Sequence, residues 1–222
     1  MSVLIRGGRI VTAADDYLGD VYIENGTVSL LGESLDVAAD KTIDASGKLV
    51  FPGAIDPHSH LEMAFGGTVT CDDFTSGTTS AAFGGTTTHI DFCMQAPGTS
   101  FAQSLENYFE KIERCKPLID VGFHMAVTDL HDGGSLKELA TLPDQGVTSY
   151  KLFMAYKGAI MVDDDTLFRT MQTATGSAAA TTNHAALLCS LRSNAKPATR
   201  PIMNRTGPVK AAPRIAAGSA SS

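Results

Sequence analysis

Tryptophan is absent from this sequence of 222 residues, cysteine occurs four times, and no apolar run approaches membrane-spanning length. The cysteines form no Cys-x-x-Cys pair and show no regular spacing, so neither a disulfide framework nor a structural zinc knot is expected. The first eight residues lack the long apolar region of a signal peptide. These absences predict a soluble cytoplasmic protein with reduced thiols and no membrane partner.

Acidic and aromatic residues are unevenly distributed along the chain. No Asp, Glu, Phe or Tyr follows Ala174, whereas six of the 17 basic residues do. The remaining 11 basic residues face 24 acidic ones, which gives residues 1–174 a net charge of −13 and the tail +6. A strongly acidic body argues against nucleic acid as a partner.

Residues 1–52 are expected to form a small β domain. Short β-prone stretches alternate there with turn signals, and Asn25-Gly26 is a strong hairpin signal. The expected strands are 3–5, 8–11, 20–23 and 27–31.

From Gly53 to Ala174 the pattern changes to strands that alternate with helices, which indicates a parallel α/β sheet. Asp163, Asp164 and Asp165 are expected to cap a helix rather than to bind metal, since acidic residues suit the first turn of a helix. The expected strands are 54–58, 87–92, 121–127 and 147–153, and the expected helices are 101–115, 136–142 and 166–171.

Residues 175–222 form a third segment, rich in Ala, Ser, Thr, Pro and Arg and without a sustained hydrophobic period. Such a composition buries little apolar surface and predicts a disordered basic tail. The abrupt change from acidic to basic composition suggests a translated wrong reading frame or an artificial join. A genuine evolved tail is the alternative.

Asp56-Pro57-His58-Ser59-His60 places two imidazoles directly after an apolar stretch. If that stretch is a strand, side chains two residues apart point to the same side, so both rings can reach one metal ion. A pair of solvated loop histidines is the alternative interpretation, because the His-x-His spacing is common.

Four blocks of sequence resemble the dihydropyrimidinase/hydantoinase family of cyclic amidohydrolases. They are residues 56–63, 65–70, 82–88 and 150–158, and the similarity extends from about Ser2 to about Ala174. This resemblance implies an α/β fold in which residues 53–174 form the N-terminal half of a (β/α)₈ amidohydrolase barrel. Residues 1–52 would then be the N-terminal part of a β-sandwich domain. The fifth barrel strand and its histidine have no recognisable counterpart.

The resemblance also implies a binuclear metal site, with zinc as the expected metal. His58 and His60 match two metal ligands. Lys151 matches the lysine that reacts with carbon dioxide and bridges two divalent ions as a carbamate. Tyr156 matches the tyrosine that donates to the developing oxyanion. Without the resemblance, Lys151 would be interpreted as an ordinary exposed lysine at a strand end.

Four apolar residues fall on the substrate-facing loops of the resembled family and are candidates for an apolar substrate pocket, with core packing as the alternative: Met63, Phe65, Phe153 and Ile160. Four histidines match no ligand position and are interpreted as structural, solvated or unrelated to the site: His89, His124, His131 and His184. Asp91 and Cys93 are assigned no role.

By resemblance, the chain is a metal-dependent hydrolase that opens dihydropyrimidines or 5-substituted hydantoins to N-carbamoyl amino acids, in a family of homo-oligomers. Glu62 stands where dihydroorotases usually carry an arginine, which argues against that relative, and an allantoinase fits residues 65–68 less well. Later metal ligands and the last-strand aspartate have no counterpart, so the chain alone is expected to be inactive. The alternatives are a truncated family member without activity and a non-catalytic interaction protein such as the collapsin response mediator proteins.

Overall fold

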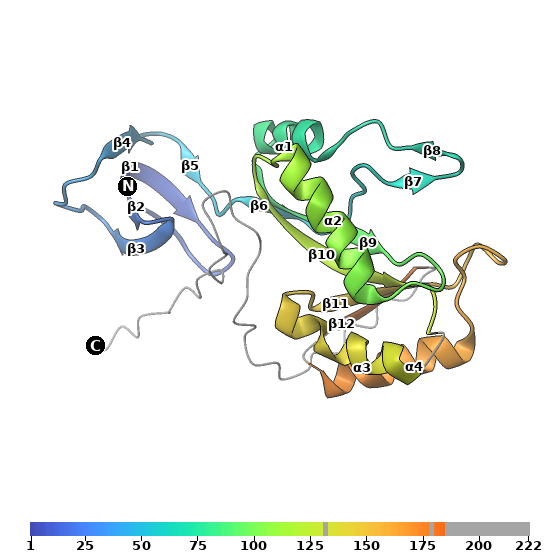
Figure 1. The fold of residues 1–222 in the computed structure, drawn as a ribbon. Coiled ribbons are helices and arrows are strands. Elements are labelled where there is room, and N and C mark those ends of the chain that lie inside the picture. The colour runs from blue at the N-terminus through green and yellow to red at the C-terminus, as the bar shows by residue number, and fades with distance from the viewer. Residues whose placement is uncertain (131–132, 178–179, 185–222) are drawn as a thin grey trace. The chain divides into compact units, whose positions relative to one another are not determined.

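The computed structural model of this chain describes residues 1–130, 133–177 and 180–184. These residues separate into two compact units, which meet in the sequence between Gly53 and Ala54. The first unit is a β-sheet, and the second combines a parallel sheet with helices (Figure 1). The predicted α/β class is therefore confirmed.

The first unit is built around a long central strand, β1, which pairs with three neighbours. β1, β2 and β3 run antiparallel, while β4 and β5 pair parallel to β1. The predicted hairpin turn joins β2 to β3, and Asn25 and Gly26 have φ angles of 53° and 78°. The strands are β1 (Ser2–Val11), β2 (Asp16–Glu24), β3 (Thr27–Gly32), β4 (Lys41–Asp44) and β5 (Leu49–Val50).

Asp20 is a buried carboxylate that connects three parts of the first unit. It accepts hydrogen bonds from the backbone N–H groups of Gly7 (2.7 Å) and Leu35 (2.9 Å), and Arg6 lies 3.8 Å away. The bonds from Leu35 and Gly7 lower the pKa of the Asp20 carboxyl below its usual value.

We expect Asp20 to make the stability of the first unit depend on pH. Because its pKa is lower in the folded chain, its contribution is present above the unfolded pKa of about 4 and is lost as the pH falls below it. Urea unfolding at pH 7 and pH 3 measures this loss, and Asp20→Asn should show a smaller loss than the wild type. An equal loss in both proteins would contradict the assignment.

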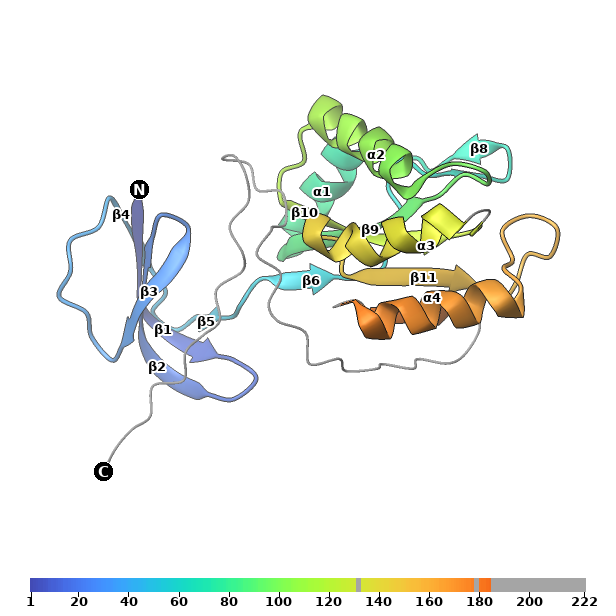
Figure 2. The same cartoon turned by 60° about the horizontal axis from the view of Figure 1, so that its bottom comes forward.

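The sheet of the second unit contains five strands in the order β12-β11-β10-β9-β6, and every neighbouring pair is parallel. A short antiparallel hairpin, β7–β8, lies at the same end of the sheet as the loop that follows β11 (Figures 1 and 2). The sheet strands are β6 (Ala54–Asp56), β9 (Thr86–Met94), β10 (Asp120–Val127), β11 (Ser149–Phe153) and β12 (Ala180–His184), and the hairpin strands are β7 (Ala64–Phe65) and β8 (Thr68–Val69).

The expectation that no fifth strand follows, and that the chain is disordered from Thr175, needs correction for the described residues. Helix α4 continues to Gly176, and β12 then pairs with β11 along its full length. The composition of this segment suggested disorder. However, an open strand edge has unpaired backbone groups that a further strand can satisfy whatever its side chains are. The rest of the predicted tail, residues 185–222, lies outside the described residues.

Helices connect the parallel strands: α1 and α2 pack against β9, and α4 packs against β11 and β12. Asp163 caps α4 by accepting a hydrogen bond from Thr166, as predicted. Helix α1, which the sequence did not reveal, begins after the cap Asp73. No helix in the described ranges is long and apolar enough to cross a membrane. The helices are α1 (Phe74–Phe83), α2 (Phe101–Cys115), α3 (Gly133–Thr141), the 3₁₀ turn η1 (Leu142–Gln145) and α4 (Asp164–Gly176).

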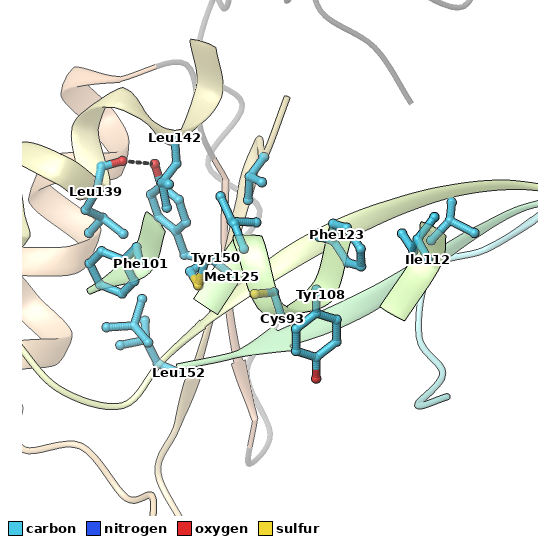
Figure 3. Close-up of a cluster of buried hydrophobic side chains, with 14 of the residues drawn as sticks. Cys93, Phe101, Tyr108, Ile112, Phe123, Met125, Leu139, Leu142, Tyr150 and Leu152 are labelled. Carbon is cyan, nitrogen blue, oxygen red and sulfur yellow. Dashed lines mark hydrogen bonds between the residues drawn. The ribbon is translucent and has the colours of Figure 1, made fainter. Parts of the chain in front are cut away.

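The core of the second unit lies between the helices and one face of the sheet (Figure 3). The side chain of Tyr150, on β11, is fully buried there, and its hydroxyl donates to the carbonyl of Leu139 at 2.6 Å. Met125 and Leu152 pack in the same cluster. Since successive strand residues point to opposite faces, their neighbours Lys151 and His124 point away from the helices.

Candidate functional site

Two histidines follow the first strand of the parallel sheet, but they are not part of it. β6 ends at Asp56, whose carboxylate accepts a hydrogen bond from the backbone N–H of His58 at 3.0 Å. His58 and His60 therefore lie in a loop, and the predicted extension of the strand to residue 58 is wrong. Strand alternation does not bring their rings together, so another contact must.

Phe92, on β9, is that contact. The rings of His58 and His60 lie 4.7 and 4.8 Å from the Phe92 ring, centroid to centroid, and 5.6 Å from one another. The His124 ring is 4.8 Å from Phe92, and the Lys151 amine is 3.7 Å above it. Three imidazoles and one amine thus surround a single aromatic ring on the face of the sheet away from the helices.

Lys151, on β11, is only 3% exposed, although its side chain carries an ionisable amine. The Lys151 Nζ lies 3.5 Å from His58 Nε2 and 4.9 Å from the Phe153 ring. Burial lowers the pKa of this amine, and the charge of Asp91 acts in the opposite direction. A lowered pKa raises the share of neutral amine, which is the nucleophilic form.

The site offers a metal ion three side chains, but one of them must first be modified: they are His58, His60 and Lys151. Imidazole nitrogen is a common zinc ligand, whereas an unmodified lysine amine is not. Within the described ranges, no group of three or more His, Cys, Asp or Glu residues is arranged to hold a metal. The set therefore fits a metal if Lys151 supplies an anionic oxygen, as a carbamate does.

The other predicted residues lie near the end of the sheet where its strands finish: Phe153 ends β11, Phe65 lies on β7, and the rest lie in the loops beside these two strands. The Tyr156 ring lies 5.9 Å from the Phe65 ring of the β7–β8 hairpin and 6.2 Å from the Phe153 ring. Tyr156 is 49% exposed and has a φ angle of 64°, which is uncommon for a residue other than glycine. Met63 and Ile160 are half-buried in the same two loops. Their part in a pocket remains a prediction.

Two residues that match no ligand position, His124 and Asp91, contact the histidine loop. His124, on β10, hydrogen-bonds the Pro57 carbonyl through Nε2 at 2.9 Å, and burial lowers the pKa of its ring. Asp91, on β9, accepts a hydrogen bond from the backbone N–H of Leu61 at 2.9 Å. The signal that points to His124 is its register, since it lies directly opposite Phe92 in the sheet.

The remaining residues of interest lie around this cluster or outside the described residues. Glu62 forms an ion pair with Arg114 of α2, which connects the loop after His60 to that helix. The backbone of His184 lies opposite Phe153 at the end of β12, while the His184 side chain and all of His131 fall outside the description. The prediction that these two histidines are not ligands is untested.

The comparisons with known proteins agree on one group of relatives. The D-hydantoinase of Geobacillus stearothermophilus is 47% identical over 172 residues, which cover 77% of this chain and 36% of that protein. The dihydropyrimidinase of Arabidopsis thaliana is 43% identical over 167 residues, which cover 74% of this chain and 31% of the relative. No protein-family model matches the chain.

Solved structures give the same result. The dihydropyrimidinase of Brevibacillus agri superposes with a TM-score of 0.78 at 44% identity, covering 83% of this chain and 40% of that one. The D-hydantoinase of a Bacillus species gives a TM-score of 0.77 at 46% identity, with 82% and 39% covered. The chain spans less than half the length of these relatives. Over about three quarters of its length, this chain is homologous to the D-hydantoinases and dihydropyrimidinases.

Proposed function

We propose that this chain carries the first part of a metal-dependent hydrolase that opens dihydropyrimidines or 5-substituted hydantoins to N-carbamoyl amino acids. The observation that supports this best is the approach of His58, His60 and the buried Lys151 around Phe92. In this proposal residues 53–174 form the first half of a (β/α)₈ barrel, and residues 1–52 form the N-terminal part of a β-sandwich domain. The proposed substrates are small cyclic amides. The complete protein is proposed to assemble from identical subunits.

The described residues would prepare the site for two divalent ions, with zinc as the proposed metal. His58 and His60 would bind one ion through ring nitrogens. The neutral amine of Lys151 would attack the carbon of carbon dioxide; a nitrogen–carbon bond forms, one proton leaves, and an anionic carbamate with two oxygens results. The metal pair would supply a water of lowered pKa as the nucleophile.

Tyr156 would act on the substrate rather than on the metal. Its hydroxyl would donate a hydrogen bond to the oxygen on which negative charge develops as the ring amide is attacked. The rings of Phe65 and Phe153 flank Tyr156 and offer an apolar wall for the substituent of the substrate. Met63 and Ile160, in the same loops, would extend that wall.

A chimera tests the proposed function directly. Residues 1–174 of this chain replace the matching segment of the D-hydantoinase of Geobacillus stearothermophilus, whose own residues then supply the rest of the protein. We expect the purified chimera, loaded with zinc in the presence of bicarbonate, to hydrolyse dihydrouracil or a hydantoin, and chelation to remove the activity. The 222-residue chain alone is expected to be inactive.

A folded chimera that binds zinc but hydrolyses none of these substrates would contradict the proposal, and would favour a family member without catalytic activity. Circular dichroism and thermal melting establish whether the chimera is folded. If it is not, zinc binding by the 222-residue chain decides instead: uptake that Lys151→Met and His58→Ala do not reduce would contradict the proposed site.

In an active chimera, Tyr156→Phe is expected to lower kcat by about 100-fold to 1,000-fold, since one oxyanion donor is worth roughly that much. Bound zinc, measured by atomic absorption, should not change, because the hydroxyl contacts the substrate and not the metal ligands. Tyr17→Phe is the matched control, since Tyr17 lies on β2 in the other unit. Equal kcat values for both variants would exclude Tyr156 as the donor.

A further inference from the structure

The segment from Pro57 to Leu61 carries both candidate metal ligands, and it is held at each end by a side chain from a neighbouring strand. At its start, the Pro57 carbonyl receives a hydrogen bond from His124 Nε2 at 2.9 Å. At its end, the Leu61 N–H donates to Asp91 Oδ2 at 2.9 Å. We call these two contacts, which enclose His58 and His60, the His124 clamp and the Asp91 clamp.

The Asp91 clamp is a buried carboxylate with a fixed orientation. Asp91 is completely buried, and its other oxygen, Oδ1, accepts a hydrogen bond from the backbone N–H of Phe92 at 2.6 Å. His89, which is also buried, lies with Nε2 at 3.1 Å from Asp91 Oδ2. The carboxylate is thus held by its own strand, and it can fix the Leu61 backbone rather than follow it.

In the His124 clamp, the two ring nitrogens of His124 have different roles. A carbonyl oxygen only accepts hydrogen bonds, so Nε2 of His124 must carry the hydrogen that points to Pro57. In a neutral ring Nδ1 is then an acceptor, and the hydroxyl of Ser149 on β11 donates to it. Both nitrogens of His124 are engaged in this way, so the ring is suited to hold the backbone rather than to bind a metal.

We propose that Asp91 and His124 are positioning residues, which fix the backbone on both sides of the two histidines so that their imidazoles are oriented before a metal arrives. This inference rests on the proposed metal site. The segment lies outside the strand, so no sheet hydrogen bonds order it. Without the clamps, metal binding would have to restrict the backbone of residues 57–61 further. The lost conformational entropy would lower the affinity for the metal.

Zinc affinity of the 222-residue chain, measured by competition with a chromophoric chelator, tests the clamps. We expect Asp91→Asn and His124→Leu each to weaken zinc binding by about 10-fold to 100-fold, as the loss of supporting contacts around metal ligands does. His124→Gln, which keeps an N–H donor near the position of Nε2, should restore affinity to within about threefold of the wild type, a rescue that the apolar leucine cannot give.

Leu142→Ala is the matched control for a merely structural effect. It truncates a fully buried core side chain but leaves both clamps in place, so it should lower the melting temperature and change zinc affinity less than about twofold. Wild-type affinity in both Asp91→Asn and His124→Leu would overturn the inference. So would a loss in Leu142→Ala as large as that in Asp91→Asn, because the effect would then follow stability and not the loop.

His58→Ala separates this inference from the proposed function. If His58→Ala abolishes zinc binding while the clamp variants bind normally, the site stands and the clamps fail. If His58→Ala binds like the wild type, or the wild type binds no zinc, hydrogen exchange in the metal-free chain decides. Faster exchange of the Leu61 amide in Asp91→Leu, with the Met125 amide unchanged, supports the clamp, and unchanged exchange at Leu61 overturns it.

Discussion

Lys151→Met is expected to reduce the kcat of the chimera by on the order of a thousandfold or more, and to remove most of its bound zinc. Methionine keeps an unbranched apolar side chain in a position that is 3% exposed, so the fold should survive the change. The amine, however, is lost, and with it the carbamate that would bridge the two ions. Metal ligands and nucleophile act as a unit, so the loss of one member removes far more than an additive share.

Lys157→Met is the control for this prediction. Lys157 lies six residues further on, in the loop after β11, and is exposed. Its replacement should leave kcat and zinc content within about twofold of the unmodified chimera, as expected for a surface change away from special features. Steady-state hydrolysis and atomic absorption give both quantities. Activity in Lys151→Met close to that of Lys157→Met would contradict the assigned role of Lys151.

Leu152→Ala is expected to destabilise the second unit by about 2–5 kcal/mol, the usual cost of truncating a buried leucine. Leu152 is fully buried in the core beside Tyr150, and the same strand presents Lys151 on the opposite face. Loosening this strand should therefore also disturb the lysine. Urea unfolding of the 222-residue chain, followed by circular dichroism, measures the free energy of unfolding.

Leu118→Ala is the matched control, because Leu118 precedes β10 and is 41% exposed. We expect it to cost less than about 1 kcal/mol, since a partly exposed side chain leaves a smaller cavity and loses less burial. Equal costs for the two variants would show that β11 does not pack against the helices as described.

Helix α2 shows where sequence reasoning works well. Apolar residues at helical spacing, among them Phe101, Leu105 and Ile112, predicted a helix over residues 101–115, and the structure has the same limits. Helix α1 was missed because Thr, Ser and Gly occupy much of it and give no clear apolar stripe. Its local signal was the capping box. The Asp73 carboxylate accepts a hydrogen bond from the Ser76 backbone N–H, and the Ser76 hydroxyl accepts one from the Asp73 backbone N–H.

The candidate site could be predicted only in part. The resemblance pointed to His58, His60 and Lys151, and the structure places them around Phe92. Alternation along a strand does not bring the two histidines together, because β6 ends at Asp56. What brings the rings together is the neighbouring strand, and such contacts depend on a register between strands that no local pattern reveals.

The clamps were invisible to sequence reasoning for the same reason. His124 and Asp91 are far from the histidine loop in the chain, and neither matches a ligand position. Only the parallel pairing of β9 with β10 places His124 opposite Phe92 and so beside Pro57. The edge strand β12 was missed because pairing with β11, and not its own composition, decides its structure.

The central claim is that Lys151 becomes a carbamate that binds metal together with His58 and His60. Carbon-13 NMR of the zinc-loaded chimera in labelled bicarbonate tests it most directly. The parent hydantoinase, measured in the same way, is the reference. We predict one carbamate resonance in the chimera, absent from Lys151→Met and strongly reduced in His58→Ala. No carbamate resonance in a folded, zinc-loaded chimera, or the same resonance in Lys151→Met, would contradict the claim.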